Sequence, residues 1–333
     1  MYTKLLKKDK KPSDFNIFNI ESEYQNINSE GYDALIVING NVNYFGGIDN
    51  PSDTLCYYII NHFNGPVFYM LCDPHILLTQ IWKSIEKKEW ASKYKKEDIE
   101  ITRDDIVYIS QPRNTKLLKS IVDKKTGIKI KDIIHFPFEN FVYLTSDYKE
   151  NHFNYEYDLM YGGTFRSGRR QQDMIKFYFG YPDDIKVKMF GKIKKDDFKK
   201  NKYNLRYPEF GKSVSYDNFN DEMSKSLSTV IISDPLYKEL DDIAQRVHEG
   251  ILTGNIVFID ESADRNKIVF GKNPVLSKFS YVKNREDVEK RIRMLNNFGF
   301  DYIKRIINLQ RMLTKIDKIE YSNKLKEILE RYV

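Results

Sequence analysis

The chain has 333 residues, of which 41% are hydrophobic and 31% are charged. This length accommodates two domains of ordinary size, each with an ample hydrophobic core. A net charge of +6 is too small to establish a nucleic-acid partner by itself, and the absence of an 18-residue apolar run argues against a membrane-spanning helix.

The first fourteen residues, MYTKLLKKDKKPSD, contain lysines but no apolar core, so they do not resemble a signal peptide. Their pattern predicts a short basic helix that ends at Pro12. The two cysteines, Cys56 and Cys72, lie in apolar runs, which predicts buried free thiols in a reducing compartment. No cysteine and histidine group has the spacing of a zinc site, and we expect no metal ligands from the protein.

The first half of the chain alternates apolar strands with helical segments. The strands are predicted at 15–20, 34–38, 67–71, 106–110 and 133–138. The helices are predicted at 54–63, 82–100 and 115–122. Unbroken apolar runs such as ALIVI at 34–38 are typical of a parallel sheet that is covered on both faces.

A polar stretch at 140–156 indicates a crossing between domains, and the alternation then repeats. Strands are predicted at 158–161, 186–190, 229–233 and 256–259. Helices are predicted at 171–179, 239–250, 287–297, 301–315 and 321–332. This alternation predicts an α/β protein with two doubly wound, Rossmann-like domains, whose strand carboxyl ends face each other across a cleft. We expect domains at 1–150 and 151–317, with a helix at 318–333 packing back on the first.

The segment YDLMYGGTFRSGRRQQDMIKFYF, residues 157–179, has the pattern of an anion-binding site. A buried strand leads into Gly162 and Gly163, which predict a tight turn that another group can approach closely. A helix with one buried face is predicted from Gln171. Free N–H groups at a helix start favour an anion, and the arginines at 166, 169 and 170 add paired hydrogen bonds to phosphate oxygens. A glycine-rich turn with solvated arginines is the alternative.

Two further places in the sequence carry carboxylates suited to chemistry. Asp73 ends a predicted buried strand, where it is either a general base for a hydroxyl or the cap of the following segment. Arg246 and Glu249 lie three residues apart on a predicted helix, so they share a face. They are either a phosphate contact with an acceptor for paired sugar hydroxyls, or a surface ion pair worth less than about 1 kcal/mol. Tyr237 is predicted to line the same cleft.

Several residues suit a nucleic-acid partner. Phe45, on a loop after a strand, either folds into the core or fills the gap that a flipped base leaves. Lys88 belongs to a lysine cluster mixed with aromatic residues, which suits a polyanion carrying bases, although a solvated lysine-rich surface has the same composition. His75 is either a surface histidine or a contact to phosphate or substrate.

The chain resembles the DNA β-glucosyltransferases of T-even bacteriophages, which have the GT-B fold. The resemblance covers most of the chain and rests on dispersed blocks that keep their order. These blocks are YDALIVINGNVNYFGG (32–47), the segment from Asp73 to Trp90, FPFE (136–139), YGGTFRSGRR (161–170), RVHE (246–249), FIDE (258–261) and YVKNRED (281–287).

The resemblance implies transfer of glucose from UDP-glucose to the hydroxyl of 5-hydroxymethylcytosine in double-stranded DNA, with inversion at the anomeric carbon. It implies that Asp73 is the catalytic base. The donor is then bound by Gly163, Thr164, Arg166, Arg170, Tyr237, Arg246, Glu249 and Glu139. The DNA is then contacted by Asn43, Phe45, Gly46, His75 and Lys88. A divalent cation, Mg²⁺ or Mn²⁺, on the diphosphate is compatible with this chemistry. We expect a monomer without a membrane partner, in the cytoplasm of the infected bacterium.

The sequence also departs from the family pattern. The chain is expected to begin inside the family's first helix, so that the first strand of the N-terminal domain and its glycine-containing loop are missing. His75 stands where the family has arginine, and Ser213–Val214 lies where the uracil pocket has a different turn. Three alternatives therefore stay open. They are another acceptor, such as hydroxymethyluracil or a sugar already on DNA; another UDP-sugar; and a catalytically impaired DNA-binding relic.

Overall fold

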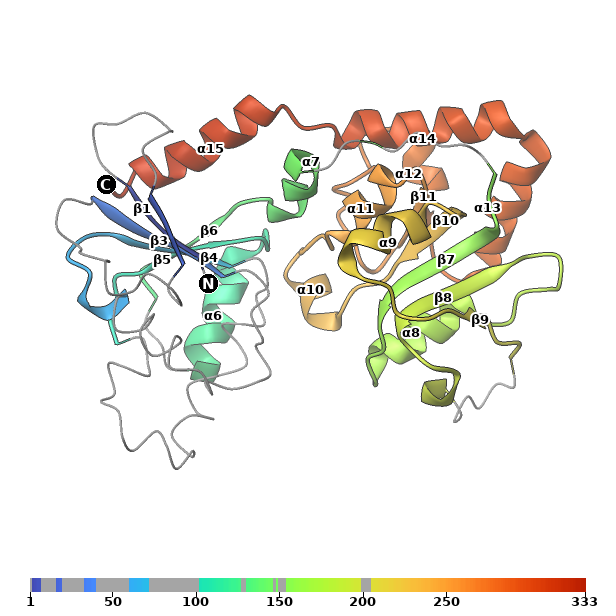
Figure 1. Ribbon diagram of the computed structural model, residues 1–333, viewed down its shortest axis with the longest axis horizontal. Helices are drawn as coiled ribbons and strands as arrows, with labels where there is room; N and C mark the ends of the chain where they lie inside the picture. The colour runs from blue at the N-terminus through green and yellow to red at the C-terminus, as the bar shows by residue number, and fades with distance from the viewer. Residues whose placement is uncertain are drawn as a thin grey trace. The chain divides into compact units, whose positions relative to one another are not determined.

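The computed structural model describes residues 2–6, 16–19, 33–39, 60–71, 102–126, 130–145, 148, 154–198 and 205–333 (Figure 1). The chain divides into two compact units, of which the first is Met1–Phe138 with Lys318–Val333 and the second is Glu139–Asp317. The sequence prediction drew the boundary at 150. The packing of Val142 and Tyr143 on Leu252 instead assigns the stretch after Phe138 to the second unit.

The first unit contains a six-stranded sheet in the order β2-β1-β3-β4-β5-β6. Strands β3 to β6 are parallel to one another, as their apolar sequences predicted, whereas β1 is antiparallel to both of its neighbours. The strands are β1 (Tyr2–Leu6), β2 (Asn16–Asn19), β3 (Ala34–Asn39), β4 (Val67–Leu71), β5 (Val107–Ser110) and β6 (Asp132–His135).

The prediction of a basic helix at the start of the chain is wrong, because Tyr2–Leu6 pairs with β2 and β3. A five-residue segment is too short for hydrophobic periodicity to separate a helix from a strand. The strand predicted at 133–138 is also too long, because β6 ends at His135 and the 3₁₀ helix η4 begins at Phe138.

Helices α6 (Thr115–Thr126) and α15 (Lys318–Glu330) belong to this unit. Leu118 and Val122 of α6 are fully buried. On α15, the Tyr321 hydroxyl donates a 2.8 Å hydrogen bond to the carbonyl of Pro137, and its ring lies 4.7 Å from that of Phe136. The last residues of the chain thus complete the core of the unit that contains the first strands.

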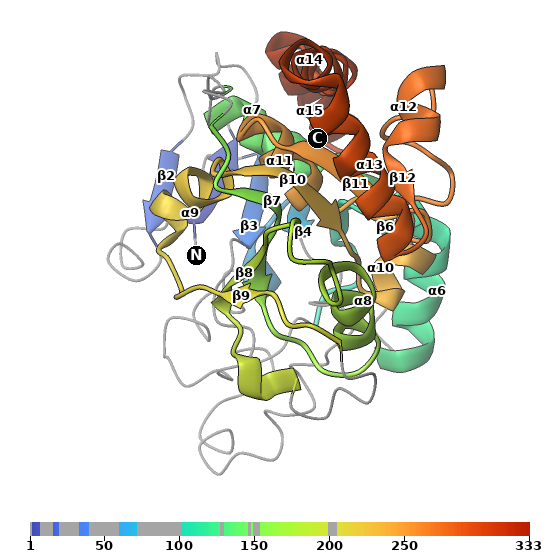
Figure 2. The same cartoon turned by 90° about the vertical axis from the view of Figure 1, so that its right-hand side faces the viewer.

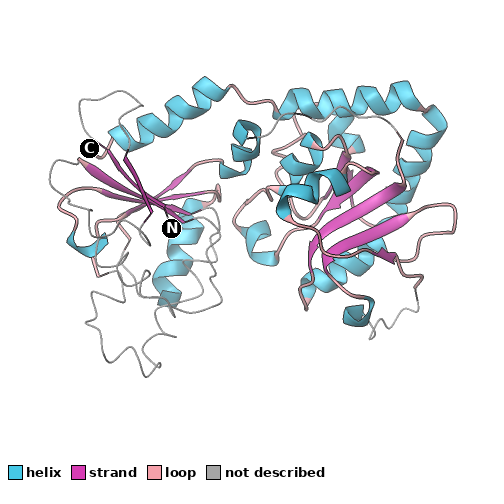
Figure 3. Cartoon of the chain, viewed as in Figure 1, coloured by secondary structure: helices cyan, strands magenta, loops and turns pink. Residues whose placement is uncertain are grey.

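The second unit contains a fully parallel six-stranded sheet in the order β12-β11-β10-β7-β8-β9. Figure 3 draws the strands in magenta and the helices around them in cyan. Its strands are β7 (Tyr157–Thr164), β8 (Val187–Lys192), β9 (Glu209–Phe210), β10 (Ser226–Ile231), β11 (Ile256–Asp260) and β12 (Tyr281–Val282). Numbered along the chain, this is the order 3-2-1-4-5-6 that is characteristic of dinucleotide-binding, Rossmann-type domains.

The helices of this unit are α7 (Val142–Thr145), α8 (Arg169–Tyr178), α9 (Tyr216–Met223), α10 (Pro235–Glu239), α11 (Arg246–Leu252), α12 (Pro274–Phe279), α13 (Arg285–Phe298) and α14 (Phe300–Thr314), with η5 at Lys195–Phe198. The sequence predicted one helix over 239–250, which is wrong. Asp241 has a φ of 50°, a left-handed conformation that interrupts a helix, so α10 and α11 are separate.

Strand β7 has helices on both of its faces, as Figure 2 shows for α9 and α8. Leu159 and Tyr161 join the main core, which includes Met174 of α8. Met160 points the other way and packs in a cluster with Phe219 of α9. This alternation is that of a strand buried on both sides, which explains the unbroken apolar run in the sequence.

No helix in the described part of the chain is both long enough and apolar enough to cross a bilayer.

Candidate functional site

A cavity lies at the point in the sheet of the second unit where the strand order reverses. β7 and β10 are neighbours in the sheet, and the strand order runs outward from them in opposite directions. The cavity is lined by the end of β7 and by Thr229–Ile232 at the end of β10. Open parallel sheets bind ligands at this switch point, beyond the carboxyl ends of their strands.

The two glycines at the end of β7 do not form the tight turn that the sequence predicted. Gly162 and Gly163 remain in the strand, paired with Phe190 and Gly191 of β8. The predicted close approach is present: a Cβ on Gly162 would lie 2.5 Å from the Phe219 ring, and one on Gly191 would lie 2.0 Å from the carbonyl oxygen of Gly163. The glycines therefore make room for an aromatic wall and for a neighbouring strand.

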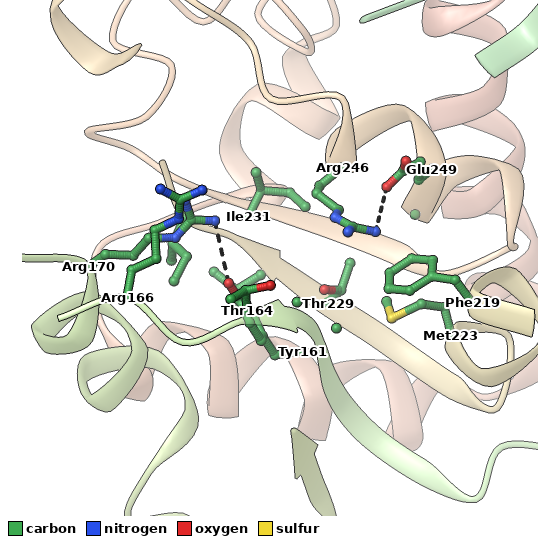
Figure 4. A pocket seen from close by; sticks show the side chains of 15 residues that line it. Tyr161, Thr164, Arg166, Arg170, Phe219, Met223, Thr229, Ile231, Arg246 and Glu249 are labelled. Atoms are coloured by element: carbon green, nitrogen blue, oxygen red, sulfur yellow. Dashed lines mark hydrogen bonds and ion pairs between the residues drawn. The ribbon is translucent and has the colours of Figure 1, made fainter. Parts of the chain in front are cut away.

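Arg166 and Arg170 lie at one end of the cavity (Figure 4). Gly168 has a φ of 76° and precedes the first residue of α8. The Arg170 guanidinium donates a long, 3.4 Å hydrogen bond to the Tyr161 hydroxyl, and its Nε is a buried donor with no partner among the described residues. A cation with an unsatisfied buried donor at a helix start is suited to an anionic ligand.

Arg246 and Glu249 of α11 form another wall of the cavity (Figure 4). Their side chains are joined by a 2.8 Å hydrogen bond, and the Arg246 guanidinium lies 4.0 Å from the centre of the Phe219 ring. Burial raises the pKa of the Glu249 carboxyl, and the positive charge of Arg246 opposes this rise without cancelling it. The arginine thus has a fixed position beside a buried carboxylate.

A second hollow adjoins the cavity and shares Arg166 and Arg170 with it. Arg169 at the start of α8 also lines this hollow, and so do Asp234 and Pro235 at the start of α10. The Asp234 side chain accepts a hydrogen bond from the backbone N–H of Leu236, which caps α10. Arg166 and Arg170 therefore face both hollows, and Arg169 faces the second one.

Most of the predicted donor residues line the cavity. They are Gly163, Thr164, Arg166, Arg170, Arg246 and Glu249. Tyr237 lies on α10, next to the second hollow but outside both linings. Glu139 is buried in η4 and lines neither recess. Asp73 and the predicted DNA contacts Asn43, Phe45, Gly46, His75 and Lys88 lie outside the described residues.

Sequence reasoning missed the apolar wall of the cavity, which is made by Phe219 and Met223 of α9. No helix was predicted over 216–223, because this short segment carries polar residues and few large apolar ones. Phe219 and Met223 are four residues apart, which is the helical spacing that could have identified them.

The chain is similar to known proteins in sequence. Residues 16–142 match the family model described as bacteriophage T4 beta-glucosyltransferase. The DNA beta-glucosyltransferase of Enterobacteria phage T4 is 25% identical over 312 residues, which are 92% of this chain and 86% of that protein.

The chain is also similar in structure to T4 phage BGT. A T4 phage BGT mutant in complex with UDP-glucose superposes with a TM-score of 0.76 at 25% identity, covering 91% of this chain and 85% of that one. T4 phage BGT in complex with UDP and Mn²⁺ gives a TM-score of 0.76 at 25% identity over the same shares. The resemblance that the sequence indicated is therefore confirmed, and each unit has the Rossmann-like α/β organisation of the GT-B fold.

Proposed function

We propose that this protein is an inverting glucosyltransferase that moves glucose from UDP-glucose to the hydroxyl of 5-hydroxymethylcytosine in double-stranded DNA. The observation that carries the proposal is the recess at the switch point of the second sheet, which combines Arg166, Arg170, Arg246 and Glu249. The similarity of the chain to a DNA beta-glucosyltransferase, and to structures of T4 phage BGT with UDP-glucose and with UDP, supports the choice of donor.

The charges of the recess suit the leaving group of this reaction. As the bond from the anomeric carbon to the diphosphate breaks, negative charge grows on UDP. Arg166, just before α8, and Arg170, in its first turn, stabilise that charge together with the helix N-terminus. Arg246 contacts a phosphate, and the Glu249 carboxylate accepts from the two ribose hydroxyls. Gly163, Thr164 and Tyr237 complete the donor contacts, with Glu139 at the sugar.

Asp73 is the general base in this proposal. It follows β4 by two residues in the sequence, at the carboxyl end of a parallel strand. Its carboxylate takes the proton of the hydroxymethyl group as that oxygen attacks the anomeric carbon. The oxygen–carbon bond forms on the face opposite to the departing diphosphate oxygen, which keeps the bonding electrons. One displacement of this kind inverts the anomeric configuration.

The acceptor nucleotide must leave the double helix to reach a catalytic carboxylate and a donor that are held by the protein. Phe45 is the aromatic side chain that fills the resulting gap, with Asn43 and Gly46 on the same loop. His75 and Lys88 contact the DNA strand. Lysine contacts to phosphate position the DNA without reading its sequence, so preference beyond the modified base is weak.

A divalent cation would be held mainly by the diphosphate. The charged lining of the cavity consists of three arginines and Glu249, and Glu249 is bonded to Arg246. Among the described residues no group of acidic, histidine or cysteine side chains is placed to hold a metal. We propose that the protein works as a monomer on phage DNA, in the cytoplasm of the infected bacterium.

The test is transfer of glucose from radiolabelled UDP-glucose to duplex DNA containing 5-hydroxymethylcytosine, with matched cytosine duplex as the control. We expect label on the modified duplex only. Asp73→Ala should abolish transfer and leave UDP affinity within about twofold, because the base does not contact the nucleotide. Folded protein that binds UDP and does not label the hydroxymethylcytosine duplex would contradict the proposal, and label on a hydroxymethyluracil duplex alone would assign the other acceptor. UDP binding by itself separates an enzyme from a relic that has lost its donor site.

A further inference from the structure

A cluster of buried charges lies beside the arginine-lined hollow. The Lys238 ammonium, on α10, is 3.1 Å from the Asp173 carboxylate on α8 and 3.1 Å from the Asp260 carboxylate at the end of β11. It also donates a 2.8 Å hydrogen bond to the Ser262 hydroxyl. Lys238, Asp173 and Asp260 are 8%, 6% and 2% exposed, so the three charges are almost completely removed from water.

Each buried charge of the cluster has an oppositely charged partner. Ser262 donates a 2.5 Å hydrogen bond to Asp260, and Lys176 lies 3.6 Å from the other oxygen of the same carboxylate. Burial by itself would raise the pKa of Asp260, but Ser262, Lys238 and Lys176 together lower it below its usual range. Asp260 is therefore an ionised anchor for Lys238, fixed to the rigid end of a central strand.

The cluster lies one helical turn from residues that line the hollow. Asp173 is three residues after Arg170 on α8, and Lys238 is three residues after Pro235 on α10, so each pair shares a helix face. Arg170 and Pro235 belong to different helices, and both line the hollow. The Asp173–Lys238 bond thus joins the two helices within one turn of that lining.

We infer that the Lys238–Asp173 ion pair, anchored on Asp260, holds α8 and α10 at a fixed separation. This separation sets the width of the arginine-lined hollow in which the phosphates bind. Lys238 and Asp173 are positioning residues, because they line neither recess and act through the arginines of α8. Separating buried opposite charges is strongly unfavourable in a low-dielectric interior, so such a pair tolerates little change in distance. The inference rests on the proposed binding of a nucleoside diphosphate in this recess.

The experiment measures UDP affinity by calorimetry on the full chain, together with thermal stability. Lys238→Met removes the ammonium and with it the ion pair that joins α8 and α10. Asp173→Glu keeps both charges but lengthens the acidic side chain by one methylene. We expect each to raise the UDP Kd by about tenfold or more, because small misplacement of a positioned group has large effects. The KM for UDP-glucose should rise with the Kd, while kcat at saturating donor changes less.

Tyr281→Phe is the matched control. It removes a buried 2.6 Å hydrogen bond to Asp264 in the same unit, and neither residue lines the recess. We expect it to lower stability and leave the UDP Kd within about twofold, which calibrates the effect of destabilisation alone.

The outcomes separate this inference from the proposed function. If wild-type protein binds UDP and Asp173→Glu and Lys238→Met bind it as tightly, the inference is overturned. If Lys238→Met does not fold, Asp173→Glu decides by the same criterion. If UDP affinity falls as expected but wild-type protein transfers no glucose to DNA, the positioning role stands and the proposed function fails. Wild-type protein that binds no UDP overturns both.

Discussion

The Arg246 guanidinium donates a 2.8 Å hydrogen bond to the Glu249 carboxylate, three residues along α11. The glutamate is largely buried, whereas the arginine is 41% exposed and faces the cavity. A pair placed in this way offers a cation to a phosphate and a carboxylate to hydroxyls from one helical turn. It is more than a solvated ion pair, because one of its members is removed from water.

The first prediction concerns this pair. Arg246→Met should weaken UDP binding by about 100-fold, because it removes a charged phosphate contact and leaves Glu249 buried without its cation. Arg246→Lys should recover only part of the affinity, since lysine lacks the planar, two-pronged donor geometry. Titration calorimetry with UDP measures both. A Kd for Arg246→Met within about threefold of wild type would exclude Arg246 from the donor site.

The second prediction is a dependence on pH. The folded pKa of Glu249 is raised above its ordinary value of 4.5, so the folded protein binds more protons than the unfolded chain between these two values. The contribution of this group to the free energy of unfolding is therefore largest at low pH and declines as pH rises through that window. Glu249→Gln should lack the decline. Denaturant unfolding of both proteins at several pH values between about 4 and 7 checks the sign.

UDP affinity should change with pH in the direction opposite to the Glu249 contribution to the free energy of unfolding. An ionised carboxylate accepts more strongly from the two ribose hydroxyls than a protonated carboxyl does, so UDP binding by the wild-type protein should weaken as pH falls through the raised pKa of Glu249. Glu249→Gln should bind UDP more weakly near neutral pH, by about tenfold, and lack this step. A step of equal size in both proteins would assign it to a different group.

The third prediction concerns Gly162. Adding a Cβ there would place a carbon 2.5 Å from the Phe219 ring, which stacks on Arg246. Gly162→Ala should therefore displace the aromatic wall, cost about 1–3 kcal/mol of stability through overpacking, and weaken UDP binding. Gly299→Ala is the control, because Gly299 has a φ of 72° but an added Cβ would have no described atom within 4 Å. It should be destabilising through backbone strain and leave UDP affinity unchanged.

The fourth prediction concerns the last helix. Tyr321→Ala should destabilise the first unit by about 3 kcal/mol, because it removes a buried ring that packs on Phe136. Tyr321→Phe keeps the ring and loses the hydrogen bond to Pro137, so it should cost only about 1 kcal/mol. Asn323→Ala, at an exposed position of α15, should be near neutral. Denaturant unfolding measures the series, and equal losses for Ala and Phe would contradict the packing argument.

The strands that could be predicted are those with long apolar runs. Residues 34–38, 67–71 and 256–259 lie within β3, β4 and β11, because a strand covered on both faces needs apolar side chains on both. Two short edge strands, β9 and β12, were not predicted, since two-residue pairings leave no periodic pattern. The break between α10 and α11 depends on the conformation of one residue, Asp241, which local propensity does not specify.

The sequence by itself determined the chemistry of the proposed donor site, because the arginines at 166 and 170 and the Arg246–Glu249 spacing are local patterns whose residue types suit a phosphate and a sugar. Only the tertiary structure decided that these two patterns, about eighty residues apart in the chain, share one recess with Phe219 and Met223. It also decided that Lys238 forms ion pairs with both Asp173 and Asp260. Contacts of this kind arise from the order of strands in the sheet, and strand order depends on long-range packing that no local pattern records.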